Sequence, residues 1–233
     1  SNRKLLAVLK SDSQTELERY LRQIPDEYKL KINEVCTDLR PSYGVVVKAL
    51  LPNAILTADR FHVEMVARRT LDEIRSIIQD EAKGSRMNLK RLLWLNKYQL
   101  NINERIKLES AFKKYEYYPV LKQAWIIKEK IIQMYCSPSE GEALKRFNHV
   151  MLLLETCDHS RYLSVLRGTL KKWKQPIINY FKNKTTNGFT EGCHTKIKMI
   201  KRVSFGFRNI NNYIAKITLA FLPLFFILNH HTV

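Results

Sequence analysis

The chain has 233 residues and carries 40 Lys and Arg against 22 Asp and Glu, which gives a formal net charge of +18. Hydrophobic residues make up 45% of it, which is enough to bury a core and argues against extensive disorder. Such an excess of positive charge favours a polyanionic partner, with nucleic acid as the leading class; a solvated basic surface without a partner is the alternative. The four cysteines form no CxxC pair, which argues against a zinc ribbon and a disulfide framework.

Neither end of the sequence predicts targeting to a membrane. The opening SNRKLLAVLKS lacks the pattern of a signal peptide. The C-terminal run ITLAFLPLFFIL contains Pro223 and is short for a bilayer span, so it is expected to end a core helix. We therefore expect a cytoplasmic protein.

The first sixty residues alternate between strand and helix patterns. Ser13 and Glu16 form a capping box at the start of the first helix, and Pro41 suits the N-terminus of the second. The order strand–helix–strand–helix–strand favours an α/β fold with parallel strands. The predicted strands cover residues 3–11, 29–38 and 53–59, and the predicted helices cover residues 13–24 and 41–51.

From His62 onward the apolar residues recur with a period near 3.6, which is typical of helices. The helical pattern continues almost to residue 185. We therefore expect a partial α/β core over residues 1–62, an all-helical insertion over residues 63–184, and core-completing helices with a C-terminal tail over residues 185–233.

Two aspartates follow predicted strands, Asp38 in VCTD and Asp59 in LTAD. Ligands and metals gather beyond the carboxyl ends of strands in open parallel sheets, and carboxylate oxygens bind hard cations. The alternative is that each aspartate caps a helix or starts a turn.

Residues 183–209 predict a basic amphipathic helix with Thr190 as its N-cap and Glu191 in its first turn. The acid would lead a row of polar and cationic residues on one face, opposite an apolar face. The polar face comprises Glu191, Thr195, Lys198 and Arg202, and the apolar face comprises Cys193, Ile197 and Ile200. Such a helix could offer an acid to a metal and cations to phosphates. The alternative is an ordinary basic helix whose acid complements the helix dipole.

Three stretches of the sequence are long, ordered motifs. They are CTDLRPSYGVVVKALLPNAILTADRFHV, VEMVARRTLDEIR and NGFTEGCHTKIKMIKRVSFGFRN. Together they resemble the DDE-type insertion-sequence transposases of the ISL-three family. The resemblance implies an α/β, ribonuclease-H-like core of the retroviral-integrase type, incomplete at its N-terminus and interrupted by a large all-helical insertion. It also implies metal-dependent DNA cleavage and strand transfer at insertion-sequence ends, with two Mg²⁺ or Mn²⁺ ions in the intact site.

The resemblance assigns roles to particular residues. Asp38 matches the second catalytic acid and Glu191 the third, and both are expected to bind metal. Asp59, with His62, matches a signature expected to support the site, although Asp59 is also a rival metal ligand. Cations of the last matched stretch are expected to bind DNA; these are Lys196, Lys198, Lys201, Arg202 and Arg208.

The chain departs from the family pattern in two ways. His194 stands where the family usually has Asn. The strand that carries the first acid is not found, so we expect an N-terminally truncated transposase that is inactive alone. The alternative is an inactive basic DNA-binding or scaffold protein derived from a transposase. The expected partners are insertion-sequence ends, target duplex and further copies of the chain, near the bacterial nucleoid and without a membrane.

Overall fold

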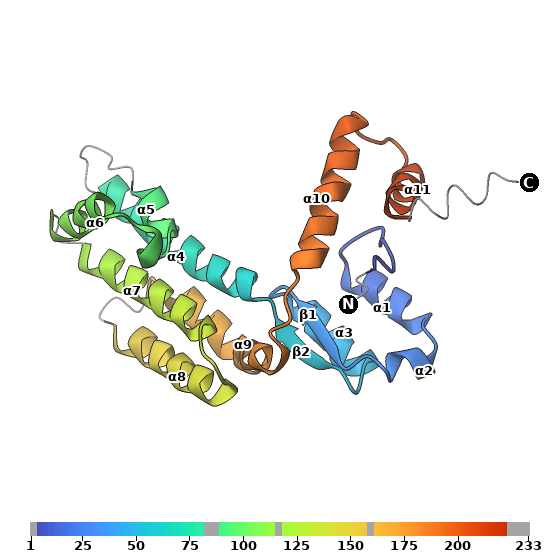
Figure 1. The fold of residues 1–233 in the computed structure, drawn as a ribbon, viewed down its shortest axis with the longest axis horizontal. Helices are drawn as coiled ribbons and strands as arrows, with labels where there is room; N and C mark the ends of the chain where they lie inside the picture. Colours follow the sequence, from blue (N-terminus) through green and yellow to red (C-terminus); the bar gives the residue numbers. More distant parts are fainter. Residues whose placement is uncertain (1–3, 82–88, 115–117, 158–160, 223–233) are drawn as a thin grey trace, which may run out of the picture. The chain divides into compact units, whose positions relative to one another are not determined.

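The computed structural model divides into two compact units and is mostly helical, with a two-stranded sheet among the described residues (Figure 1). The described residues are 4–81, 89–114, 118–157 and 161–222. Unit 1 comprises residues 1–35, 40–54 and 186–233, and unit 2 comprises residues 36–39 and 55–185. No helix of the described residues is both long enough and apolar enough to cross a membrane.

Unit 1 is built from helices near both ends of the chain. They are α1 (Gln14–Arg22), α2 (Asp26–Lys29), α3 (Pro41–Leu50), α10 (Gly188–Val203) and α11 (Ile210–Phe221). Helix α1 packs on α3, and α10 contacts α11. The predicted cap at Ser13 is confirmed, because its hydroxyl accepts the backbone N–H of Glu16 at 3.2 Å. Tyr43 of α3 donates to the Asp12 carbonyl at 3.0 Å, which ties α3 to the loop before α1.

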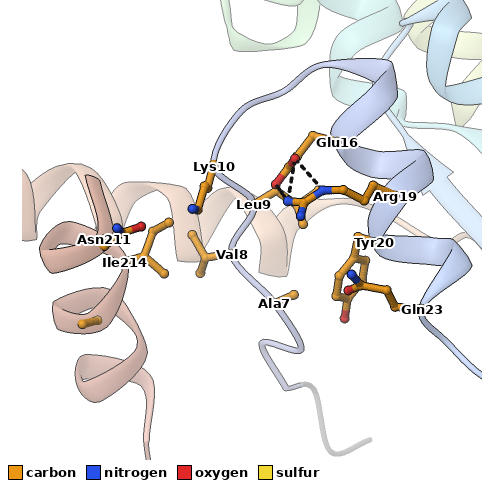
Figure 2. Close-up of a pocket in the computed structure, with 11 residues that line it drawn as sticks. Ala7, Val8, Leu9, Lys10, Glu16, Arg19, Tyr20, Gln23, Asn211 and Ile214 are labelled. Atoms are coloured by element: carbon orange, nitrogen blue, oxygen red, sulfur yellow. Dashed lines mark hydrogen bonds and ion pairs between the residues drawn. The ribbon is translucent and has the colours of Figure 1, made fainter. Parts of the chain in front are cut away.

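The strand predicted at residues 3–11 is wrong over its described part, because residues 4–11 form no strand. A strand requires a neighbour that completes its ladder of hydrogen bonds. This run instead passes between α1 and α11, where Val8 lies beside Ile214 (Figure 2). A pocket of about 410 Å³ lies there, with Tyr20 on the α1 side. The apolar pattern correctly indicated that this segment packs against the protein. It could not show whether a neighbouring strand was present to form hydrogen bonds with it.

Unit 2 is a helical body that also contains the strand at Ile55–Ala58 and the carboxyl end of the strand at Glu34–Thr37. Its helices are α4 (Arg60–Glu81), α5 (Lys90–Trp94), η1 (Lys97–Gln99), α6 (Ile102–Lys114), α7 (Tyr118–Tyr135), α8 (Glu140–Thr156) and α9 (Ser164–Asn183). Helix α4 packs on α5, α7 and α9, and α8 packs between α7 and α9. Leu71, Leu121 and Leu154 are fully buried. The Ser139 hydroxyl accepts the Glu142 N–H at 3.3 Å and so caps α8.

The sheet pairs β1 (Glu34–Thr37) with β2 (Ile55–Ala58). The Asp59 N–H, just beyond β2, donates to the carbonyl of Thr37, the last residue of β1, at 2.9 Å. The carboxyl ends of the two strands therefore lie at one edge, as in a parallel pair. Backbone groups of successive strand residues point to opposite sides, so the Leu56 carbonyl points away from β1. Asn179 of α9 donates to that carbonyl at 2.9 Å.

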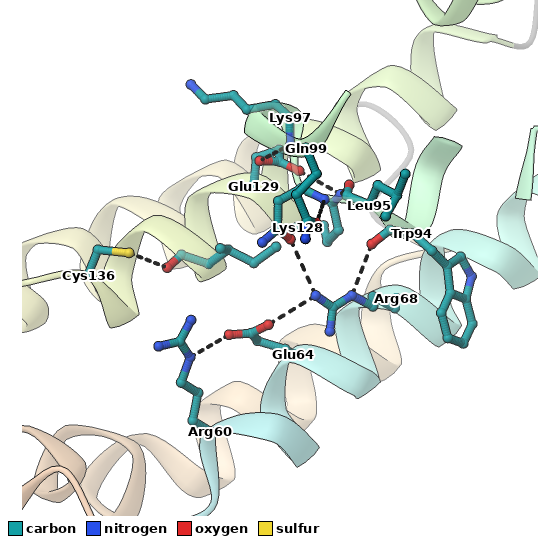
Figure 3. A network of polar contacts seen from close by, with 12 residues as sticks. Arg60, Glu64, Arg68, Trp94, Leu95, Lys97, Gln99, Lys128, Glu129 and Cys136 are labelled. Carbon is teal, nitrogen blue, oxygen red and sulfur yellow. Dashed lines mark hydrogen bonds and ion pairs between the residues drawn. The ribbon is translucent and has the colours of Figure 1, made fainter. Parts of the chain in front are cut away.

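A buried ion pair within α7 makes hydrogen bonds to the end of α5 and to the residues that follow it (Figure 3). The Lys128 ammonium donates to the carbonyls of Leu93 and Leu95 at 2.9 and 2.7 Å, and it lies 2.6 Å from Glu129. Glu129 in turn accepts the Lys97 N–H. Burial lowers the pKa of Lys128, although the charge of Glu129 opposes this. These contacts satisfy carbonyls at the end of a short helix.

The predicted division into a core over residues 1–62, an insertion over residues 63–184 and a final part over residues 185–233 stays a prediction. The C-terminal tail, residues 223–233 with Pro223, lies outside the described residues.

Candidate functional site

Asp59 lies at the junction between β2 and α4. It is 2% exposed and follows Ala58, which is fully buried. Its carbonyl accepts the Val63 N–H at 3.3 Å, so its backbone begins the helix. Its carboxylate Oδ2 lies 3.0 Å from Nδ1 of His62, one helical turn later. The Asp59–His62 contact fixes the orientation of both side chains.

Asp38 lies at the neighbouring strand end of the same unit. It is half-buried and follows Thr37, whose hydroxyl donates to the Asp38 carboxylate at 3.4 Å. The carbonyl of Thr37 accepts the Asp59 N–H. The predicted position of both aspartates after adjacent strands is therefore confirmed. Carboxylate oxygens, and the imidazole nitrogens of a residue such as His62, are of the kinds that bind divalent cations.

Behind Asp59, a row of charges at i, i+4 spacing follows α4 (Figure 3). Arg60 Nε lies 2.6 Å from Glu64, and Arg68 lies 3.1 Å from the other oxygen of Glu64. Arg68 also donates to the Trp94 carbonyl at 3.2 Å. The sequence analysis missed this row, although the i, i+4 spacing was a signal for it. The row anchors the first turns of the helix that carries His62.

Tyr135, at the end of α7, was also missed. It is 4% exposed, and the Arg60 guanidinium lies 5.4 Å from its ring centre. Burial, followed by the negative charges of Glu64 and Asp59, raises the pKa of Tyr135 well above its ordinary value. The phenol therefore stays protonated beside the Asp59 region. Nothing in the local sequence pattern distinguishes it from other aromatic residues of the helix.

Glu191 lies in the first turn of α10 and is half-buried. Helix α10 begins at Gly188, with Asn187 as its N-cap, so the predicted cap at Thr190 is wrong. Cys193 and Ile200 are buried, as predicted for the apolar face. Asp59 and His62 are in direct contact within unit 2, and Asp38 belongs to the same unit, whereas Glu191 belongs to unit 1.

The rest of α10 after Glu191, together with α11, carries basic side chains and no acidic ones. Residues 192–222 contain no Asp or Glu. The Lys196 ammonium donates to the Ala220 carbonyl and lies 4.4 Å from the centre of the Phe221 ring, so it also serves the packing of α10 on α11. The other four cations predicted to bind DNA are exposed; they are Lys198, Lys201, Arg202 and Arg208. His194 is exposed as well.

The chain is similar to known transposases along most of its length. The profile of the ISL3-type DDE family, described as "Transposase", matches residues 1–217. A transposase for insertion sequence element IS1001 from Bordetella parapertussis is 23% identical over 211 residues, covering 87% of this chain and 50% of the relative. A transposase for insertion sequence element IS1557 from Mycobacterium tuberculosis (strain CDC 1551 / Oshkosh) is 25% identical over 225 residues, covering 85% and 49%, respectively.

The chain thus spans about half the length of the curated relatives that it matches. No solved structure matches it. The family match, which covers far more than half of the chain, includes both strand-end aspartates and helix α10, which carries Glu191 in its first turn. The chain belongs to the ISL3-type family of DDE transposases.

Proposed function

We propose that the chain supplies the second and third acids of a DDE transposase site, in a protein that cleaves DNA and transfers strands at insertion-sequence ends. The observation that carries this proposal is the placement of Asp38 and Asp59 after adjacent strands whose carboxyl ends lie together. In an α/β sheet this edge is where ligands bind. The same strand–helix–strand unit supports a ribonuclease-H-like core.

The donor set fits a hard divalent cation, Mg²⁺ or Mn²⁺. Carboxylate oxygens are the ligands that Mg²⁺ prefers, and Asp38 is half-buried at the strand edge. Asp59 is already oriented by His62, which suits it to supporting the site. We assign Asp38 and Glu191 as metal ligands; because Glu191 belongs to unit 1, its approach to Asp38 is part of the proposal. Two bound ions would activate water or a DNA 3′-hydroxyl for in-line attack on a phosphodiester.

DNA is the proposed partner, and the surface that supports this is the acid-free stretch of α10 and α11. Lys198, Lys201 and Arg202 are exposed on or near one side of α10, where phosphates can approach. A transposase joins two DNA ends to a target, so we propose that the chain acts as a homo-oligomer at the nucleoid of the bacterial cytoplasm.

An inactive DNA-binding or scaffold protein is the second candidate. The acid-free stretch over residues 192–222 supports it as well as the transposase function, because such a surface can bind DNA whether or not the acids bind metal. Metal binding therefore separates the two functions.

The test is titration of the chain with Mn²⁺, followed by electron paramagnetic resonance of the free ion. We expect Asp38→Asn and Glu191→Gln each to weaken Mn²⁺ binding by about tenfold or more. Asp72→Asn is the matched control, because Asp72 is a carboxylate of unit 2 that pairs with Arg75 and Lys90. If all three variants bind Mn²⁺ like the unmodified chain, the assigned ligands are wrong. If the unmodified chain binds none, the scaffold function is favoured.

A further inference from the structure

The turn after α10 exposes an aromatic side chain on a strained backbone. Phe205 is 101% exposed, and its φ is 51°. A bulky residue other than glycine rarely adopts a positive φ, because that conformation is sterically strained. Among the described residues, Lys184 is the only other non-glycine residue with a positive φ. Because its ring is fully exposed, packing does not explain why Phe205 adopts this strained conformation.

Backbone hydrogen bonds hold Phe205 in this conformation. Its N–H donates to the Arg202 carbonyl at 3.1 Å, and the Gly206 N–H donates to the Lys201 carbonyl at 3.0 Å. These two bonds form a Schellman motif, and Phe205 occupies the left-handed position that usually holds glycine. Gly206 follows with a φ of 93°, which suits glycine alone.

Phe207, the next aromatic residue, is packed against the protein, in contrast to the exposed Phe205. Phe207 stacks on Tyr213 of α11, with ring centres 4.7 Å apart. Lys216 donates to the hydroxyl of Ser204 at 2.9 Å, which joins α11 to the residue before Phe205. The turn is thus anchored on both sides of Phe205, and the Phe205 ring is presented to solvent on a fixed backbone.

The charges around the turn indicate what Phe205 contacts. Residues 192–222 hold six cations and no carboxylate. Lys201 and Arg202 precede the turn, and Arg208 follows it; all three are exposed. An exposed aromatic ring among cations is how proteins bind unpaired nucleic acid, because the ring stacks on a base and the cations bind the adjacent phosphates.

We propose that Phe205 stacks on an unpaired or extrahelical DNA base while Lys201, Arg202 and Arg208 bind the flanking phosphates. The ligand is a base because its flat apolar face matches the exposed ring, and it is unpaired because bases inside a duplex already stack on each other. This inference rests on the proposed function, which supplies DNA as the partner. It adds a base contact to a surface that otherwise binds only the backbone.

The experiment uses the complete chain and two short DNA duplexes, one fully paired and one with a single extrahelical 2-aminopurine. We expect Phe205→Ala to weaken binding to the extrahelical probe by about tenfold and to the paired probe by less than about twofold. The unmodified chain should quench 2-aminopurine fluorescence, and Phe205→Ala should not. Tyr98→Ala is the matched control, since Tyr98 is an aromatic residue of unit 2 that is 74% exposed; it should change neither readout.

A second variant separates stacking from folding. Phe205→Gly removes the side chain at a position where glycine is unstrained, so we expect its thermal midpoint to rise while quenching is lost. Phe205→Trp should retain quenching. A lower midpoint for Phe205→Gly, with quenching retained, would show that Phe205 serves the fold and would overturn the proposal.

The cations distinguish failure of this inference from failure of the proposed function. Lys201→Ala with Arg202→Ala should weaken binding to both probes alike. If it does so while Phe205→Ala binds both probes like the unmodified chain, the base contact is wrong and the DNA surface stands. If it leaves both affinities unchanged, the DNA surface assigned to α10 is wrong, and the base contact fails with it.

Discussion

Charged side chains play opposite parts in the helical body of unit 2 and in α10 and α11 of unit 1. In unit 2 the innermost cation, Lys128, is 1% exposed and pairs with Glu129, which is 8% exposed. Arg68 is also largely buried and pairs with Glu64. Residues 192–222 have no carboxylate with which to pair. The difference teaches that a net charge of +18 does not by itself locate a binding surface; we propose one where the cations lie in a stretch without Asp or Glu.

The two arrangements differ in what they stabilise. Burying an ion pair is costly, and further hydrogen bonds offset part of the cost. The carbonyls of Leu93 and Leu95 accept such bonds from Lys128. Exposed cations add little to stability, and crowding them together is unfavourable until a polyanion binds. We therefore expect substitutions in unit 2 to change stability and substitutions in α10 to change affinity.

The largest effect is expected at the buried pair. Lys128→Met leaves the Glu129 carboxylate buried without its cation and removes the donor to two carbonyls. We expect the free energy of unfolding to fall by about 3–5 kcal/mol, measured by urea denaturation. Adding Glu129→Gln should recover part of the loss, because the amide oxygen can still accept the Lys97 N–H. A loss below about 1 kcal/mol would show that the pair is not structural.

Neutralising the cations of α10 should change the affinity for DNA and leave the stability nearly unchanged. Replacing Lys198, Lys201 and Arg202 with Gln should weaken binding to duplex DNA about a hundredfold at low salt and reduce the slope of log K against log salt by about 3. The unfolding free energy should change by less than about 0.5 kcal/mol. Fluorescence anisotropy over a salt series measures the affinity and the salt slope, and urea denaturation measures the unfolding free energy. An unchanged salt slope would contradict the assigned surface.

A neutral contact in unit 2 should show an intermediate effect on stability. Asn179→Leu removes the donor to the Leu56 carbonyl at the edge of β2, and we expect a loss of about 1–3 kcal/mol. Gln175→Ala is the control, because it removes only the bond from Gln175 to the Asn179 side chain. If both variants lose the same stability in thermal unfolding, the hydrogen bond from Asn179 to the Leu56 carbonyl does not contribute more than the one from Gln175.

The smallest effect is a pH dependence at Asp72. Desolvation raises its pKa, but hydrogen bonds from Lys90 and Arg75, together with their charges, outweigh it, so the pKa lies below its ordinary value of 3.8. Because the folded pKa is the lower one, the unfolded chain binds the proton first. The stabilisation is therefore complete above about pH 4 and is lost as the pH falls below it. Asp72→Asn should flatten this part of the acid unfolding curve; a curve that keeps its shape would contradict the assignment.

Local features of the fold could be predicted from the sequence. The cap at Ser13 and the helix beginning at Pro41 depend on residues a few positions apart, and both are confirmed. The placement of Asp38 and Asp59 at strand ends followed from the same short-range patterns. Family membership followed from long ordered motifs, and the profile match confirms it.

Features that depend on distant partners could not be predicted. Residues 4–11 have an apolar pattern but no ladder neighbour, so no strand forms there. Lys128 sits in a charged, apparently exposed run, and its burial depends on carbonyls more than thirty residues away. Phe205 looks like any aromatic residue in a basic segment, and only its backbone conformation reveals that it is exposed and strained.

The central claim, that acids from both units bind one metal site, is tested most directly by cleavage of the backbone with Fe²⁺ bound in place of Mg²⁺. Hydroxyl radicals made at the ion cut the nearby chain, and mass spectrometry locates the cuts. The account predicts cuts around Asp38, Asp59 and Glu191 that excess Mg²⁺ suppresses. Cuts confined to one unit, or scattered cuts that Mg²⁺ does not suppress, would contradict it.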